Sequence, residues 1–191
     1  MRTNGPGQSS LLLLDVIDVL NKFHIPYAIV GAFAASYYGV IRASVDTDAV
    51  ISLCNKTSIV EQLVSELEKF FHKVSHRHGD IHDPVGYVLN IEDRFHNRVD
   101  LLAGLKGMRE EAFAAVTESA FMGAKIRIVG IEDFIAMKIF AGGPKDIEDV
   151  RGVLKISSPK INLPLLKDVS AQYGRDVVKK LEVLLQESAQ H

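Results

Sequence analysis

The stretch Val45-Asp46-Thr47-Asp48-Ala49-Val50-Ile51 carries two aspartates, one residue apart, within an otherwise largely apolar run. Its partial alternation and polar borders predict a β-strand over residues 45–52. Because alternate side chains of a strand share one face, Asp46 and Asp48 point the same way. Two adjacent carboxylates repel each other unless a cation neutralises them, and oxygen ligands of this kind favour Mg²⁺ or Mn²⁺. An exposed edge strand with two solvated acids would show the same pattern.

A third carboxylate, Asp100, lies in a second predicted strand, residues 98–103, with apolar neighbours on both sides. An acid embedded in such a run needs a partner. An ion pair with Arg94 or Arg98 is the ordinary explanation. Alternatively, Asp100 lies beside the first two aspartates, completes a metal site and accepts a proton from an attacking hydroxyl.

The residues before the acidic strand predict a junction that suits phosphate. Apolar residues at helical spacing predict a helix over residues 9–23, capped by one of the two serines at its start. A short buried strand, residues 27–30, ends at Gly31, and the small apolar segment 32–38 predicts another helix. Backbone N–H groups at the start of that helix favour phosphate oxygens, and Gly31 has no side chain to block them. Tight packing alone would also explain this glycine.

The remaining patterns predict further strands and then only helices. Ser58 and Glu61 have the spacing of a capping box that opens a helix running to residue 71. The histidine-rich stretch 72–84 is predicted to be the end of a strand and a loop. Strands are predicted over 86–91, 98–103 and 125–129, and helices over 131–141, from Pro144, and from Pro164 to the C-terminus with a break near Gly174. The predicted fold class is α/β, in the α+β sense: a mixed β-sheet flanked by helices, with a helical C-terminal part.

The composition is that of an ordinary globular protein. We expect a flexible leader over residues 1–8, an α/β core over 9–130 and a helical part packed on that core over 131–191. A net charge of -2 does not by itself demand nucleic acid as a partner. Cys54 is the only cysteine, which fits a reducing cytosol, and the early apolar run 11–14 is too short to span a bilayer. We therefore expect a cytoplasmic protein without a membrane partner.

Three histidines offer a second hypothesis about metal binding. His76, His78 and His82 have a spacing that could supply three nitrogen ligands to zinc. The charged and turn-forming residues around them favour instead a polar loop, which could border the binding site of a substrate. The aspartates are therefore the stronger indication of a metal site.

The acidic strand and the segment before it resemble a known signature. Ile29-Val-Gly-Ala-Phe-Ala, followed by Gly39-Val-Ile-Arg42-Ala-Ser44-Val-Asp46-Thr-Asp48, is similar to the motif of the polymerase-β-type nucleotidyltransferase superfamily. In that motif a hydrophobic strand, a Gly-Gly or Gly-Ser pair and a D-x-D pattern follow one another. More narrowly, the chain resembles the minimal nucleotidyltransferases, whose relatives include abortive-infection toxins and small antibiotic nucleotidyltransferases. Segments 99–102 and 131–149 resemble the third-carboxylate strand and the Lys-Asp segment of this branch.

The resemblance implies transfer of a nucleoside monophosphate from a nucleoside triphosphate, such as ATP, to an acceptor hydroxyl. It implies that the catalytic, Mg²⁺- or Mn²⁺-binding residues are Asp46, Asp48 and Asp100. It also implies nucleotide or phosphate contacts from Gly31, Ala32, Arg42, Ser44, Lys138 and Lys145, with Asp146 and Asp149 beside them. Judged by sequence position alone, Arg42 is also explained as a surface cation, Lys138 as a helix-packing residue and the two acids as a helix first turn.

The resemblance leaves the acceptor and the biological role open. The acceptor could be RNA such as tRNA, a protein or a small molecule. A toxin module with an antitoxin partner and a catalytically silent nucleotide-binding scaffold are the alternatives. The family pair Gly-Gly or Gly-Ser is replaced here by Gly31-Ala32, which removes a serine hydroxyl for the triphosphate and leaves the backbone amide.

Overall fold

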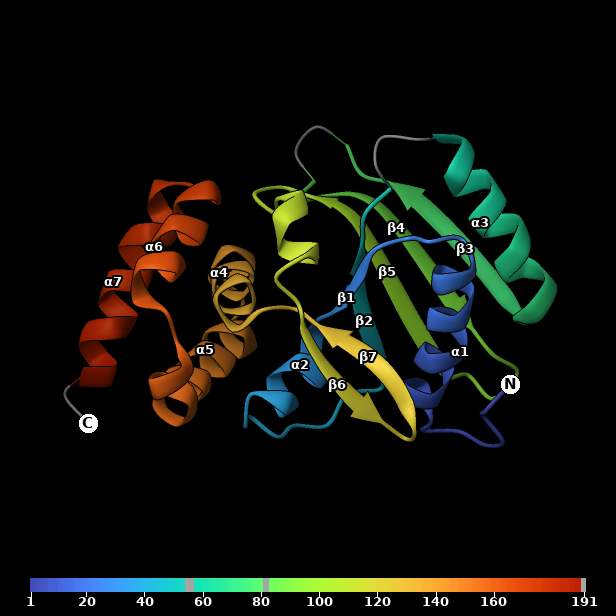
Figure 1. The fold of residues 1–191 in the computed structure, drawn as a ribbon, viewed down its shortest axis with the longest axis horizontal. Coiled ribbons are helices and arrows are strands. Elements are labelled where there is room, and N and C mark those ends of the chain that lie inside the picture. The colour runs from blue at the N-terminus through green and yellow to red at the C-terminus, as the bar shows by residue number, and fades with distance from the viewer. Residues whose placement is uncertain (54–56, 81–82, 190–191) are drawn as a thin grey trace.

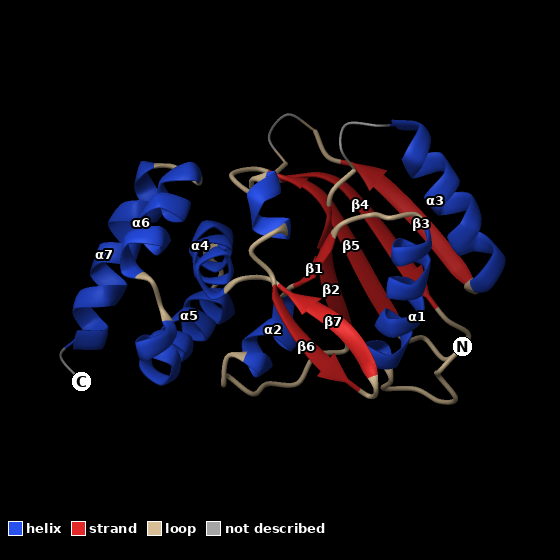
Figure 2. Ribbon diagram, viewed as in Figure 1, coloured by secondary structure: helices blue, strands red, loops and turns tan. Residues whose placement is uncertain are grey.

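One mixed β-sheet forms the centre of the molecule. The computed structural model describes residues 1–53, 57–80 and 83–189. Within these residues seven strands join in the order β3-β4-β5-β2-β1-β7-β6, drawn as red arrows in Figure 2. The strands are β1 (Tyr27–Ile29), β2 (Asp46–Ile51), β3 (Lys73–His78), β4 (Val85–Glu92), β5 (Arg98–Leu105), β6 (Thr117–Phe121) and β7 (Ala124–Ile128).

The sheet is mixed, because its central strands pair in both parallel and antiparallel directions. Strand β2 is antiparallel to β1 and parallel to β5, whereas β5 is antiparallel to β4. A parallel pair needs a long crossover, which α3 (Thr57–Phe70) and the β3–β4 hairpin supply. Strand β5 therefore lies beside β2, although a helix and two strands separate them in the sequence.

Helices α1 (Ser9–Lys22) and α3 cover one face of the sheet and lie in front of it in Figure 1. Residues of β2 and β5 that face this layer are almost fully buried: Ala49, Ile51 and Leu101 are at most 2% exposed. Helix α1 contributes a run of buried leucine, isoleucine and valine side chains to the same core. Because strand side chains alternate, the aspartates of β2 and β5 lie on the opposite face.

The C-terminal part of the chain is helical, as the sequence predicts. Helices α4 (Ile131–Ala141), α5 (Pro144–Ser157), α6 (Leu163–Gln172) and α7 (Arg175–Ala189) pack on one another beside the sheet, at the left of Figure 1. Gly142 ends α4 in the left-handed conformation and Pro144 begins α5, which is the usual placement of these residue types. Among the described residues, no helix is long and apolar enough to cross a membrane.

Two segments are more regular than their sequences indicate. The sequence does not predict β6, because residues 117–121 lack a clear apolar alternation; the strand results from antiparallel pairing with β7. The histidine-rich stretch, predicted to be the end of a strand and a loop, contains the exposed edge strand β3, which pairs with β4 along its whole length. In both cases the strand is stabilised by hydrogen bonds to a neighbouring strand, which the local sequence pattern does not predict.

The start of α1 also differs from the prediction. The N-cap residue is Gln8, without a side-chain cap, so neither serine serves in that role. Instead, the Ser9 hydroxyl donates a hydrogen bond to the backbone oxygen of Val45, at 2.7 Å, and so joins α1 to the segment before β2. Three residues named in the sequence analysis lie outside the residues whose side chains the structure describes: Ser58, which is the predicted helix cap, Cys54 and His82.

Residues 1–8, for which the sequence predicts a flexible leader, make defined contacts. One guanidinium nitrogen of Arg2 lies 2.9 Å from a carboxylate oxygen of Asp15 and 2.7 Å from one of Asp18. These acids lie three residues apart on α1, so they share one helix face and attract the same cation. The first residues are therefore attached to the outer surface of α1.

Asn97, which is 1% exposed, supplies a second attachment for the leader and gives a stability prediction. Its side chain donates to the Gly5 carbonyl and to Asp93 and accepts from the Gln8 N–H, at 2.9, 2.8 and 2.6 Å. Replacing it by alanine leaves these partners unsatisfied, so Asn97→Ala should lower the free energy of unfolding by about 2 kcal/mol or more. Urea denaturation measures the loss, with exposed Asn21→Ala as the matched control; equal stabilities for both variants would contradict the assignment.

Candidate active site

Three aspartates gather on the face of the sheet opposite to α1. Asp48 of β2 lies directly opposite Asp100 of β5 in the parallel register, and Asp46 is two residues earlier on β2. All three side chains are partly exposed, in a sheet whose other face is closed by helices. The structure therefore brings together the three carboxylates that the sequence singles out, and it does so through strand register.

Asp100 has a partner that the sequence analysis missed. The side-chain amide of Asn90, which faces Asp100 across the β4–β5 pair, donates to its carboxylate at 2.8 Å. Neither arginine considered as an ion-pair partner takes that role: Arg98 lies 3.9 Å from Glu92, and Arg94 stacks on the Phe95 ring. Only the register of two strands could have identified Asn90, because nothing in its local sequence marks it.

Gly31 lets the Asp48 carboxylate lie directly against the start of α2. It begins α2 (Gly31–Tyr37) with a φ of +62°, and the backbone N–H of Val30 donates to the carbonyl of Asp48 at 2.9 Å. A β-carbon at this position would lie 2.0 Å from a carboxylate oxygen of Asp48. Both the backbone conformation and the space thus require glycine here. The Asp48 carboxylate lies against the start of α2.

The environment of Asp48 makes its negative charge costly. Burial raises the pKa of Asp48 from 3.8 to about 6, the charges of Asp46 and Asp100 raise it as well, and Lys138 and Arg42 act in the opposite direction. A carboxylate whose pKa is raised by neighbouring like charges is typical of functional sites. A bound cation would stabilise its ionised form.

The donor set fits a hard divalent cation. Carboxylate oxygens are the ligands that Mg²⁺ and Mn²⁺ prefer, and Mg²⁺ is often held by one or two carboxylates together with water and substrate phosphates. In the described part of the chain, no three or more His, Cys, Asp or Glu side chains stand close enough together to hold an ion as they are placed. A metal site here is therefore supported by the Asp46–Asp48 pair and by the raised pKa of Asp48, whose negative charge a bound cation would stabilise.

Two cations from different parts of the chain share one buried acid. The Arg42 Nε donates to Asp149 at 3.0 Å, and the Lys138 ammonium lies 2.9 Å from the same carboxylate. Lys138 also bonds Asp146 at 2.6 Å. The side chain of Asp149 is 2% exposed, so its charge requires these partners. The ion cluster Arg42–Lys138–Asp146–Asp149 connects the segment before β2 to α4 and α5.

The other predicted phosphate contacts are placed differently. The Ser44 hydroxyl donates to a carboxylate oxygen of Asp46 at 2.6 Å, so it contacts an acid of the site. Lys145 is exposed at the start of α5 and forms no ion pair with any described residue. Ala32 is buried and can offer only its backbone. Of the six predicted phosphate contacts, Arg42 and Lys138 are thus the two cations near Asp48.

Two of the three histidines considered as zinc ligands are described by the structure. His76 and His78 lie on the edge strand β3 and contact the ring of Tyr87, at centroid distances of 5.6 and 4.7 Å. Tyr87 is buried on the α1 side of the sheet, paired in register with Ala103. The two histidines therefore pack away from the aspartates.

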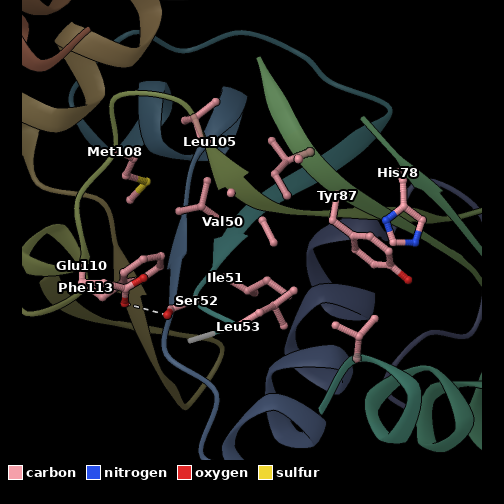
Figure 3. Close-up of a pocket in the computed structure, with 15 residues that line it drawn as sticks. Val50, Ile51, Ser52, Leu53, His78, Tyr87, Leu105, Met108, Glu110 and Phe113 are labelled. Carbon is pink, nitrogen blue, oxygen red and sulfur yellow. Dashed lines mark hydrogen bonds between the residues drawn. The ribbon is translucent and has the colours of Figure 1, made fainter. Parts of the chain in front are cut away.

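Two cavities adjoin opposite ends of β2. The first, of about 480 Å³, is lined by Asp46 and Arg42 together with Phe33 of α2 and Phe121 of β6, whose rings meet edge to face. The second, of about 380 Å³, lies where β2 and β5 end and is shown in Figure 3. Its lining is largely apolar, and its labelled acid, Glu110, accepts a hydrogen bond from the Ser52 hydroxyl at 2.6 Å.

No protein-family model matches the sequence, and no curated protein matches it. Solved structures do match. The crystal structure of ANT(2")-Ia in complex with adenylyl-2"-tobramycin is 17% identical over 85% of this chain and 95% of that one, with a TM-score of 0.55. This chain has the nucleotidyltransferase fold. An antigenic nucleotidyltransferase-like protein from Paracoccidioides brasiliensis is 16% identical over 98% and 92% of the two chains, with a TM-score of 0.54. The lincomycin-bound lincosamide adenylyltransferase LnuA is 11% identical over 81% and 99%, with a TM-score of 0.50. The expected fold is thus confirmed, and the aspartates lie on its mixed sheet.

The raised pKa of Asp48 predicts that this residue lowers stability as pH rises. A folded-state pKa above the unfolded value means that the contribution is most favourable below about pH 4 and is lost as pH rises through about 6. In EDTA, Asp48→Asn should therefore be more stable than the wild type by about 1–3 kcal/mol above pH 6 and nearly equal to it at pH 4. Urea denaturation between pH 4 and 8 measures the difference, with exposed Asp168→Asn as control. Lower stability of the folded Asp48→Asn protein at pH 8 would contradict the interpretation.

Gly31 gives a prediction with a closely matched control. Gly31→Ala introduces a strained positive φ and forces the Asp48 carboxylate to move, so it should cost about 1–3 kcal/mol and weaken Mg²⁺ binding. Gly123 also has a positive φ, of +80°, but a β-carbon there meets nothing within 4 Å. Gly123→Ala should therefore lose only the backbone strain and keep Mg²⁺ binding, measured by calorimetry. Equal Mg²⁺ affinities for both variants would show that the contact with Asp48 is unimportant.

Proposed function

We propose that this protein is a metal-dependent nucleotidyltransferase that moves a nucleoside monophosphate from a nucleoside triphosphate to an acceptor hydroxyl. The hydroxyl oxygen bonds to the α-phosphorus, the bond from that phosphorus to the bridging oxygen of the β-phosphate breaks, and pyrophosphate leaves. The observation that carries the proposal is the register pairing of Asp48 with Asp100, with Asp46 on the same face, in a chain of this fold. A silent scaffold would not need two carboxylates, Asp46 and Asp100, placed so that their charges raise the pKa of a third, Asp48. The costly negative charge of Asp48 is best explained by a cation and a substrate.

In this proposal the three aspartates have different tasks. Asp46 and Asp48 hold Mg²⁺ or Mn²⁺, and the bound ion would neutralise the charge of the phosphates. Asp100 accepts the proton of the acceptor hydroxyl or contributes to a second metal position. The amide of Asn90 orients the Asp100 carboxylate, and the Ser44 hydroxyl does the same for Asp46.

The phosphates are assigned to the cationic side of the site. Lys138 and Arg42 are the cations whose charges act on Asp48, so a triphosphate beside that residue would be within their reach. Lys145 is a further candidate at the edge, because it is exposed on the same helix as the acids of the ion cluster. The backbone of Gly31 and Ala32 is assigned as a further phosphate contact.

The acceptor is a compound that carries a hydroxyl group. The ANT(2")-Ia structure contains adenylyl-2"-tobramycin and the LnuA structure contains lincomycin, so small molecules are acceptors to test first. A polycationic acceptor would favour a cavity lined by many acids. The described lining of the two cavities carries one acid each, Asp46 and Glu110, which favours an acceptor with few positive charges. Transfer RNA and protein hydroxyls are the other arms of the test, and the single cysteine agrees with a cytosolic site of action.

The proposal is tested by supplying each labelled nucleoside triphosphate with Mg²⁺ or Mn²⁺. Label is scored on the protein itself, on bulk tRNA and on small hydroxyl compounds, including an aminoglycoside and a lincosamide. Asp46→Ala should lower transfer by about 10²-fold or more, because the reaction depends on charge neutralisation at this residue.

The matched control is Asp168→Ala, which removes an exposed acid from α6. It should transfer label as fast as the wild type. Transfer that Asp46→Ala leaves unchanged would refute the assignment of the aspartates. A wild-type protein that binds no triphosphate in the presence of metal would refute the proposed function.

A further inference from the structure

Lys138 is shared by two acids that differ in burial. Its ammonium lies 2.6 Å from Asp146 and 2.9 Å from Asp149, and its own side chain is only 12% exposed. The side chain of Asp149 is 2% exposed, whereas that of Asp146 is 26% exposed. Both acids belong to α5, on which they lie three residues apart.

Asp149 is held on both sides. Arg42 donates through Nε to both of its carboxylate oxygens, at 3.0 and 3.3 Å, and Lys138 contacts one of them. Removing Asp149 leaves Arg42 without its counter-ion and leaves Lys138 held only by the more exposed Asp146, so neither cation keeps its fixed position. Asp149 therefore fixes the positions of the two cations that act on Asp48.

Asp146 is held only from one side. Lys138 is its one ion-pair partner among residues 1–53, 57–80 and 83–189, and solvent reaches the carboxylate. It lies in the first turn of α5, where an acid is favoured by the helix whether or not it contacts Lys138. Asp146 can thus release Lys138 at low cost, which Asp149 cannot.

The ion cluster has no net charge to offer a polyphosphate. Arg42 and Lys138 supply two positive charges, and Asp146 and Asp149 supply two negative charges. The aspartates on the sheet add further negative charge beside it. A polyanion would bind such a site poorly unless one acid of the cluster gave way.

We propose that Asp146 occupies the phosphate position on Lys138 in the free protein and is displaced by the polyphosphate, while Asp149 stays in place and positions Lys138 and Arg42. This inference rests on the proposed function and assigns a different task to each acid. Displacing Asp146 leaves the cluster with one net positive charge facing the ligand. The exchange replaces one charge-assisted contact of Lys138 by another, so the ammonium does not lose its partner at any stage.

The two roles predict opposite effects of the same change in charge. Removing any acid near a bound polyanion should tighten its binding through the general field of the protein. Asp146→Asn should tighten binding beyond that, because it removes the competitor. Asp149→Asn should instead weaken binding, because Lys138 and Arg42 are no longer fixed.

The test measures binding of inorganic tripolyphosphate with Mg²⁺ by titration calorimetry, so that neither base nor acceptor needs to be known. Asp146→Asn should bind about three- to tenfold more tightly than the wild type, and Asp149→Asn about tenfold or more weakly. Glu148→Gln is the matched control, since it removes an exposed acid from the same turn of α5. It should change the affinity by less than about twofold.

Kinetics and a conservative variant separate positioning from folding. With a triphosphate substrate, Asp146→Asn should lower KM by a larger factor than it changes kcat, whereas Asp149→Asn should raise KM. Asp149→Glu restores the charge and should recover most of the affinity. If Asp149→Asn does not fold by circular dichroism, the Asp146→Asn and Asp149→Glu arms still decide the question.

The outcomes distinguish this inference from the proposed function. Weaker binding by Asp146→Asn, or tighter binding by folded Asp149→Asn, would overturn the assigned roles while the phosphate site itself stands. No binding of Mg²⁺-tripolyphosphate by the wild type would overturn the proposed function and the inference together.

Discussion

The parallel pairing of β2 with β5 is the constraint on which the rest of the site depends. It places Asp48 directly opposite Asp100 and, by the alternation of the strand, puts Asp46 on the same side. The same alternation sends Ala49, Ile51 and Leu101 into the core beneath α1, so a shift of register by one residue would bury the acids and expose the core. Hydrophobic burial on one face thus fixes carboxylates that repel one another on the other.

That repulsion explains why the helical part belongs to the site. The sheet supplies negative charge to this face. The positive charges that lower the pKa of Asp48 come from Arg42, before β2, and from Lys138 of α4. Asp149 of α5 connects both cations, and its burial makes that connection stronger than an exposed ion pair would be. The electrostatic balance of Asp48 is therefore set by three separate parts of the chain.

Local patterns were sufficient for much of the fold and for the acids of the candidate site. The D-x-D alternation, the glycine that begins α2 and the Gly-Pro boundary between α4 and α5 each have a local physical cause. Strand β6 and the length of β3 could not be predicted in this way, because pairing with a neighbour decides them. The same limit applies to Asn90, which meets Asp100 only through register, and to the link between Arg42 and Asp149, which lie far apart in sequence. The sequence offered ordinary explanations for Arg42 and Asp149, a surface cation and an acid in a helix first turn, and it did not mark Asn90.

The pair Gly31-Ala32 shows which part of the motif depends on geometry and which on chemistry. The glycine is required by its positive φ and by the Asp48 carboxylate against it, so no other residue fits. The following residue has no such constraint, and alanine removes only a hydroxyl that could have faced phosphate. The nearby Ser44 hydroxyl does not replace it, because it donates to Asp46. In the proposed reaction the phosphates thus depend more on Lys138 and Arg42, and the acids that hold those two cations become the residues that set the affinity for the nucleotide.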